Sequence, residues 1–192
     1  MTDQRLERGC VRARAEAATP AVVVAAQLGD RAALEQVLGA LQAPLFEHIR
    51  FVLRDADAAR DVLQSVLLSI ARSLHRLRDP RLISAWAFRI AHRAAVRQSR
   101  KRRDEAASLP LGEAPDLANE VPLPSLFEPE LIAALHLAVP TLPHACGAAV
   151  RLRYLEQLSL VEVAEALEIP VGTVKSRLHY GLALLKERLP TP

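Results

Sequence analysis

The sequence has few cysteines and lacks the phosphate-binding motifs by which many enzymes are recognised. Its two cysteines, Cys10 and Cys146, are too few for a disulfide framework, which fits a reducing cytoplasm. His144 stands near Cys146, but two ligands do not make a metal site, and a small buried cysteine is the simpler interpretation. The chain also lacks a P-loop and any glycine-rich phosphate loop. These absences argue against an enzyme, and we expect no metal and no cofactor.

Long apolar runs are absent as well. No stretch approaches the roughly 20 residues of a membrane-spanning helix, so we expect no membrane insertion. The N-terminal segment does not have the pattern of a signal peptide, because it is interrupted by Arg5, Arg8, Arg12 and Arg14. Hydrophobic residues make up 51% of the 192 residues, although aromatic residues make up only 4%. This composition is sufficient for one large domain or two small ones.

Charges of opposite sign are gathered in different segments, although the net charge is only +3. Between Arg72 and Arg103 there are eleven Lys and Arg residues against one acid, Asp79. Trp86 and Phe88 lie among these arginines, and cations beside aromatic rings favour nucleic acid, through phosphate neutralisation and base stacking. The alternatives are a solvated charged face and a tryptophan that anchors the core.

Residues 104–130 have the opposite character. They contain seven acids, five prolines and no Lys or Arg. Proline and the repulsion between like charges extend a chain, so this stretch predicts a flexible acidic linker.

The stretch from Leu158 to Leu189 predicts a helix–turn–helix. Ser159 and Glu162 form a capping box before an apolar run, and Pro170 ends this helix and opens the next. One face of the second helix is apolar. The opposite face carries short polar side chains and aromatic ones, with cations at its margins. A recognition helix needs this arrangement, whereas an ordinary amphipathic hairpin would mix Glu and Lys over its outer face. The residues expected to contact DNA are Thr173, Lys175, Ser176, Arg177, His179 and Tyr180.

Helical periodicity also covers the first half of the chain. Gly29 is a helix stop and Asp30 is a cap for the following helix, which we expect to end at Pro44. An apolar turn or helix follows from Leu45 to Leu53. The next cap is Asp55 or Asp57.

The helix that begins there is expected to run to about Leu77. Its apolar residues cover more than half of its circumference, so it should lie at the centre of a bundle. Its outer stripe is formed by Asp61, Gln64, Ser65, Leu68, Arg72 and His75. A single exposed leucine usually means nothing, so spacing alone leaves open whether Leu68 belongs to an interface. Pro80 breaks the chain, and a last basic helix is expected from Ala85 to Arg103.

Two blocks of sequence resemble a known family. Leu152 to Leu189, with its VGTVKSRL, is similar to the promoter-reading region 4 of bacterial sigma factors of the extracytoplasmic-function (ECF) group in the sigma-70 family. AQLGDRAALEQVL, DVLQSVLLSIARSL and AWAFRIAHRAAVRQSRKRR resemble successive parts of region 2. The resemblance covers Ala21 to Leu189 and implies an RNA polymerase sigma factor, a cytoplasmic protein that contributes no bond chemistry.

The resemblance implies an all-α fold with two small helical domains joined by the flexible acidic linker. The expected parts are a loose leader or partner-ordered helix (1–20), a region 2-like domain (21–103), the linker (104–130) and a region 4-like domain (131–190). In this family the linker threads towards the RNA exit path, where its acids stand in for RNA phosphates.

The resemblance also assigns partners. Core RNA polymerase would bind through its β′ clamp helices and β flap, and promoter DNA and an anti-sigma factor are the other expected partners. The clamp would contact Asp61, Gln64, Ser65 and Leu68. The minus-ten element and its melted strand would contact Arg78, Arg81, Trp86, Arg89, Arg93 and Arg97. The recognition helix would read the minus-thirty-five element.

The chain differs from the family pattern at five of the positions that matter. Glu168 stands where a glycine is usual, and Tyr180 stands where many members have a basic residue. Ser65 replaces a glutamate, and Arg93 and Arg97 replace Asn and Asp. The alternative function is a classical helix–turn–helix regulator that binds duplex DNA without core polymerase, but such a protein would need a sensor or phosphoacceptor domain, and the sequence shows none.

Overall fold

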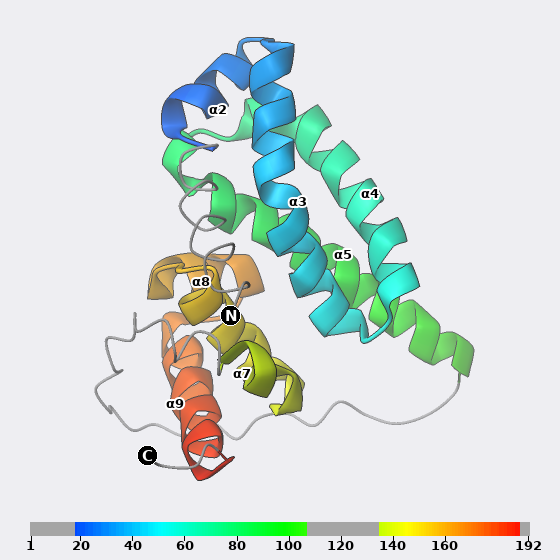
Figure 1. The fold of residues 1–192 in the computed structure, drawn as a ribbon, viewed down its shortest axis with the longest axis vertical. Helices are drawn as coiled ribbons and strands as arrows, with labels where there is room; N and C mark the ends of the chain where they lie inside the picture. Colours follow the sequence, from blue (N-terminus) through cyan, green and yellow to red (C-terminus); the bar gives the residue numbers. More distant parts are fainter. Residues whose placement is uncertain (1–17, 107–134, 189–192) are drawn as a thin grey trace, which may run out of the picture.

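The computed structural model describes residues 18–106 and 135–188. Within them every regular element is helical and no strand occurs. Figure 1 shows α2 to α5 in one half of the molecule and α7 to α9 in the other. The predicted all-α fold with two helical units is therefore confirmed. No helix of the described part is long and apolar enough to cross a lipid bilayer.

Two regions discussed in the sequence lie largely outside the described residues. The expected leader, residues 1–20, is described only from residue 18. Of the expected linker, residues 104–130, only 104–106 are described, and these continue the preceding helix.

The first two helices begin and end where local chemistry predicts. α2 (Pro20–Gln27) is followed by Gly29, whose φ of 99° lies in the left-handed region that glycine tolerates. The carboxylate of Asp30 accepts a hydrogen bond from the Ala33 N–H at 3.1 Å and caps α3 (Arg31–Leu53). Both the stop and the cap are confirmed.

The expected end of this helix at Pro44 is wrong, because α3 continues through the proline to Leu53. A proline inside a helix loses one backbone hydrogen bond and costs about 3 kcal/mol. Leu41, Leu45 and Ile49 lie on both sides of Pro44, and each is at most 4% exposed. Burial of side chains of this size contributes roughly 1.5–3 kcal/mol each, which is enough to offset the break.

Two further helices complete the first half. α4 (Ala56–Ser73) is capped by Asp55, whose carboxylate accepts from the N–H groups of Asp57 and Ala58 at 3.0 Å. Val62, Leu63, Val66 and Ile70 are buried against α3 and α5, but the expected central place of this helix is wrong: α4 lies at the edge of the bundle, because its main contacts are with these two helices, whereas α3 and α5 also contact the second half.

The bounds of these helices differ slightly from the expected ones. α4 ends at Ser73, and a 3₁₀ turn, η1 (Leu74–Arg76), takes up the residues expected to continue it. A second 3₁₀ turn, η2 (Pro80–Leu82), leads directly into α5 (Ile83–Ala106), which is longer at both ends than predicted.

The described part of the second half contains four short elements and one long helix, α9. They are η3 (Val139–Thr141), α7 (His144–Val150), the π-helical turn η4 (Arg151–Leu155), α8 (Leu160–Leu167) and α9 (Val171–Arg188). The predicted capping box is present, because the Ser159 hydroxyl accepts from the Glu162 N–H at 3.2 Å and the Glu162 carboxylate accepts from the Ser159 N–H at 2.8 Å. Gly181 lets α9 approach α7 closely, since a Cβ there would lie 2.9 Å from Val150 Cγ2.

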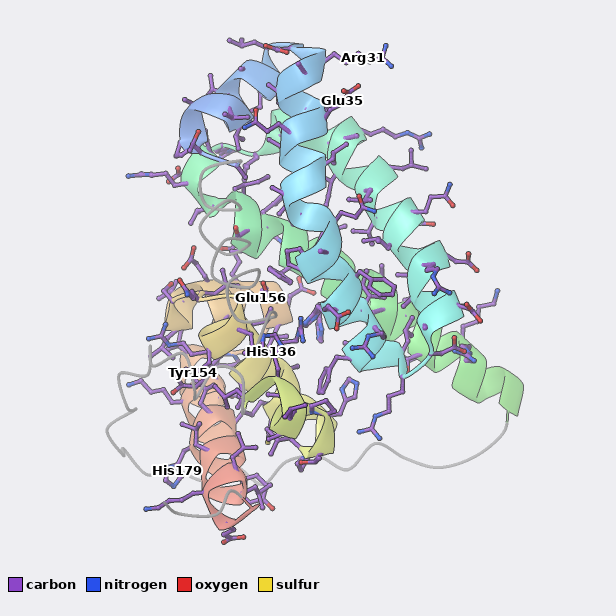
Figure 2. All side chains as sticks on the ribbon, viewed as in Figure 1. Arg31, Glu35, His136, Tyr154, Glu156 and His179 are labelled. Carbon is purple, nitrogen blue, oxygen red and sulfur yellow. The ribbon has the colours of Figure 1, made fainter. Side chains whose placement is uncertain are left out.

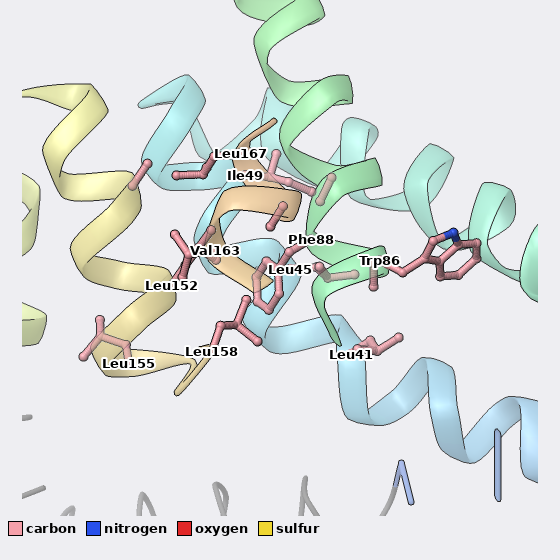
Figure 3. Close-up of a cluster of buried hydrophobic side chains, with 14 of the residues drawn as sticks. Leu41, Leu45, Ile49, Trp86, Phe88, Leu152, Leu155, Leu158, Val163 and Leu167 are labelled. Atoms are coloured by element: carbon pink, nitrogen blue, oxygen red, sulfur yellow. The ribbon is translucent and has the colours of Figure 1, made fainter. Parts of the chain in front are cut away.

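The two halves share one hydrophobic core, which the sequence did not predict. α8 packs on α5, and α7 packs on the end of α3. Figure 3 places Phe88 of α5 near Leu158 and Val163 of the second half. At Gly147 the approach of α7 to α3 leaves no space for a side chain, because a Cβ would lie 2.5 Å from Phe51 Cζ.

Candidate nucleic-acid and polymerase interfaces

The expected recognition helix, α9, presents one apolar and one polar face. Val174, Leu178 and Leu185 are almost fully buried, as predicted, and attach the helix to the rest of its half. Of the six expected DNA contacts, Lys175 is exposed, and Thr173, Ser176, Arg177, His179 and Tyr180 are half-buried. The Ser176 hydroxyl donates to the Gly172 carbonyl at 3.1 Å, which holds it close to the helix surface. Figure 2 shows His179 projecting from the outer side of α9.

Arg177 lies at the edge of this polar face, on the side of the other half. Its charge is close enough to His92 of α5 to lower the pKa of that imidazole, after burial and the charge of His144. Arg177 also acts on Cys146, whose pKa is raised by burial and lowered in part by this guanidinium. The cation at position 177 therefore contributes to the electrostatics between the halves.

The basic helix α5 carries three of the expected strand-binding cations along one side. Arg89, Arg93 and Arg97 are spaced by four residues, which aligns them on a helix. Arg89 Nη1 lies 3.0 Å from Glu165 Oε1 of α8. Arg93 donates through Nε and Nη2 to both carboxylate oxygens of Glu168, each at 2.6 Å. Two of the three cations are thus paired with the second half of the chain.

The remaining residues expected at the minus-ten element lie in different settings. Arg78 is exposed. Arg81 donates to Asp79 through Nε at 3.0 Å and Nη2 at 2.9 Å, and these bonds lower the pKa of the Asp79 carboxyl. Trp86 is only 9% exposed and belongs to the hydrophobic core, labelled in Figure 3. In this conformation the indole packs against the protein, which favours the alternative of a core anchor, and the stacking of its ring on a base stays a prediction.

The four residues expected at the polymerase clamp form an exposed stripe on α4. Asp61, Gln64, Ser65 and Leu68 are all exposed, and the Leu68 side chain is 51% exposed. The Ser65 hydroxyl donates to the Asp61 carbonyl at 3.2 Å. Their exposure is what the periodicity predicts for the side of α4 opposite its buried residues.

An open groove lies between the exposed stripe on α4 and the basic helix α5. It has a volume of about 470 Å³ and is lined by Ser65 and Ser69 on one side and Arg93 and Arg97 on the other. Residues expected to contact two different partners therefore border one surface depression. This groove could not be predicted from the sequence, because the residues of its two walls are about 30 positions apart.

A cluster of histidines between the halves was also missed. His48 of α3 is fully buried, with Nε2 lying 3.2 Å from His92 Nδ1 of α5. His144 of α7 stacks on Phe51 with ring centroids 5.3 Å apart, and its Nε2 lies 3.0 Å from the Val52 carbonyl oxygen. Burial lowers the pKa of His92 to about 4 and holds that of His48 well below its usual value, so both are neutral at pH 7. The three lie on three helices, and no sequence spacing connects them.

One buried ion pair supports the turn before the helix–turn–helix. Arg151 Nη2 lies 3.1 Å from Glu156 Oε1, and the two side chains are 8% and 9% exposed. Removing one partner of such a pair leaves an uncompensated buried charge, which is strongly destabilising. Among the described residues, no three His, Cys, Asp or Glu side chains form a group that would hold a metal ion.

Family comparisons cover both halves. Residues 38–105 match the model of sigma-70 region 2, and residues 132–185 match that of sigma-70 region 4. These two regions occur in this order along the chain, which favours a sigma factor over the alternative of a classical regulator.

Individual relatives agree with this result. The chain is 24% identical over 170 residues to the ECF RNA polymerase sigma factor SigW of Bacillus subtilis, covering 84% of this chain and 91% of the relative. It is 31% identical over 163 residues to the RNA polymerase sigma-E factor of Streptomyces coelicolor, covering 84% and 89%. Its fold is similar to that of the sigma factor RpoE of Bartonella quintana, solved in complex with the anti-sigma factor NepR, with a TM-score of 0.60, 21% identity and coverage of 80% and 94%. The chain therefore belongs to the sigma-70 family of RNA polymerase sigma factors, in its ECF group.

Proposed function

We propose that this sigma factor divides promoter recognition among three of its helices. The polar face of α9 reads the minus-thirty-five element, α5 and the preceding turn bind the melted minus-ten strand, and the stripe on α4 docks on the β′ clamp helices of core polymerase. The chain makes and breaks no bond itself, because core polymerase carries out RNA synthesis. It acts in the cytoplasm, with core polymerase and promoter DNA as its partners.

The single observation that carries this proposal is the division of α9 into two faces. Val174, Leu178 and Leu185 are buried and fix the rotation of the helix about its axis. That rotation turns Ser176, His179 and Tyr180 towards the outer side, where hydrogen-bonding side chains can reach base edges in a major groove. Lys175 and Arg177 at the margins are suited to the phosphates on either side, and Lys175 also suits a base.

The proposed role of α5 is supported by its charge. Arg78, Arg81, Arg89, Arg93 and Arg97 lie on one helix and the turns before it, and each phosphate neutralised by such a cation releases counterions. Trp86 is assigned to the core instead of the DNA surface, because it is buried.

The proposed role of α4 is supported by its exposed stripe. Leu68 is an apolar side chain left half exposed among Asp61, Gln64 and Ser65, and a partner helix that covers it would remove that apolar surface from water. We further assign the β flap of core polymerase and an anti-sigma factor as partners. The RpoE structure with NepR supports the second assignment, because that sigma factor has the same fold.

Binding of the holoenzyme to a library of promoter sequences at several salt concentrations tests the role of α9. Ser176→Ala and His179→Ala should each relax the preference at one base position and cost about 1–3 kcal/mol. Arg177→Ala should weaken binding to all sequences alike and reduce the salt slope by about one unit. A change of sequence preference in Arg177→Ala, with none in the other two variants, would show that the faces of α9 are assigned wrongly.

A further inference from the structure

The contact between α5 and α8 places acids of one half on cations of the other. Arg89 of α5 is paired with Glu165 of α8 at 3.0 Å. One helical turn further along, Arg93 forms a two-bond fork with Glu168, the residue that ends α8. A fork of two parallel bonds to a carboxylate fixes direction as well as distance, so these two pairs hold α8 in one register on α5.

Glu168 has a backbone conformation that favours glycine, which indicates that its side chain has a role beyond ending the helix. Glu168 has φ 56° and ψ 45°, the left-handed conformation in which a helix is usually ended by glycine. Glutamate disfavours this conformation because its Cβ approaches the following carbonyl. A glycine would end α8 with less strain, but it would not provide a carboxylate for Arg93.

Arg89 and Arg93 are also two of the cations assigned to the melted strand. A guanidinium that forms both of its parallel bonds to a carboxylate cannot offer the same fork to a phosphate. Strand phosphates and the carboxylates of α8 therefore compete for the same groups. Beneath these pairs Phe88 of α5 and Val163 of α8 are buried in the shared core, so the ion pairs add to an apolar contact between the two helices.

We propose that α8 closes over the strand-binding face of α5 in the free protein, and that Glu165 and Glu168 hold it there by occupying Arg89 and Arg93. This rests on the proposed role of α5 in binding the melted strand. The closed form has low affinity for single-stranded DNA, because only the open fraction presents both arginines. Displacement of α8 is thus a step that precedes strand capture.

The test uses the full-length chain with Glu165→Gln and Glu168→Gln combined. Both carboxylates are partly exposed, so the amide should leave each half folded. The matched control combines Glu35→Gln and Glu187→Gln, which removes two negative charges from exposed positions away from the contact. Small-angle X-ray scattering measures the radius of gyration, and fluorescence anisotropy measures binding of a labelled thymidine oligonucleotide at fixed salt.

The double variant should show a larger radius of gyration than the control. It should also bind the oligonucleotide roughly two- to tenfold more tightly, the range expected when two partly exposed ion pairs no longer stabilise the closed form. An unchanged radius of gyration would overturn the proposal, and so would an increase without tighter binding. Exchanging the partners, with Arg93→Glu and Glu168→Arg together, should restore the smaller radius, which a damaged fold would not do.

A separate variant distinguishes failure of this proposal from failure of the proposed function. Arg89→Ala and Arg93→Ala, added to the double variant, should abolish the gain in oligonucleotide affinity. If the gain persists while the radius remains large, α5 does not bind the strand, and both the proposed role of α5 and the inhibitory contact are overturned. If the radius never changes, only the closure is overturned.

Discussion

Acidification should destabilise the folded protein through its buried histidines. Burial lowers the pKa of His92 to about 4, compared with 6.5 for a free imidazole, aided by the charges of His144 and Arg177 and opposed by Glu168. His48, the other member of the pair, is also kept neutral, mainly by burial. Because the unfolded chain binds protons more readily than the folded one, stability must fall with pH below about 6.5 and level off near 4.

The size of the effect follows from this difference. One pKa unit corresponds to about 1.4 kcal/mol, so lowering the pH from about 7.5 to about 5.5 should remove about 1.4 kcal/mol for one histidine. A proton on one ring of the His48–His92 pair opposes a second one, since Nε2 and Nδ1 are 3.2 Å apart. This opposition helps to keep both rings neutral in the folded protein, whereas both bind a proton in the unfolded chain, so we expect the pair to lose about twice this value, about 2.7 kcal/mol, over this range.

Urea unfolding followed by the fluorescence of Trp86, the single tryptophan, measures this loss directly. His92→Gln should reduce the pH dependence of the free energy of unfolding by about half, because His48 remains buried, whereas His75→Gln, an exposed control, should leave it unchanged. An unfolding free energy that is constant between the two pH values, or an equal slope in His92→Gln, would refute the reasoning.

Two other perturbations address the proposed interfaces. Asp61→Arg combined with Leu68→Ala should weaken binding to the β′ clamp helices in a pull-down while the melting temperature stays unchanged, because both side chains are exposed; undiminished binding would remove α4 from the polymerase interface. Trp86→Ala should lower stability by about 3–5 kcal/mol, the usual cost of emptying a buried aromatic site, since Trp86 is 9% exposed. Permanganate footprinting of that variant should show normal strand opening below its melting temperature, and a loss of opening in a fully folded variant would return the indole to the DNA surface.

Features set by neighbouring residues could be predicted from the sequence. The caps Asp30 and Ser159 could be predicted, and Asp55 as one of two candidates, because a cap needs only a side-chain acceptor and the next backbone N–H groups. The buried face of α9 was readable from helical spacing, and Val174 and Leu178 are fully buried. Glu168 stands where a glycine is usual, and its backbone has the left-handed conformation that glycine tolerates.

Features that depend on distant segments could not be predicted. The continuation of α3 through Pro44 depends on packing around Leu41 and Leu45, which the local rule for proline ignores. The docking of α8 on α5 joins residues about 75 positions apart. The sequence shows acids on one helix and arginines on the other, but it does not show that the two helices meet. Arg93 and Glu168 both depart from the family pattern, and only the structure shows that they are bonded to each other.

Reconstituted transcription is the most direct test of the central claim that this chain is a sigma factor. The purified protein is added to core RNA polymerase on fragments of genomic DNA, and run-off transcripts are mapped to their start sites. We predict discrete transcripts that require both the chain and core enzyme, starting downstream of a shared pair of sequence elements. Binding of the chain alone to duplex DNA, with no transcripts unless another sigma factor is supplied, would contradict the account.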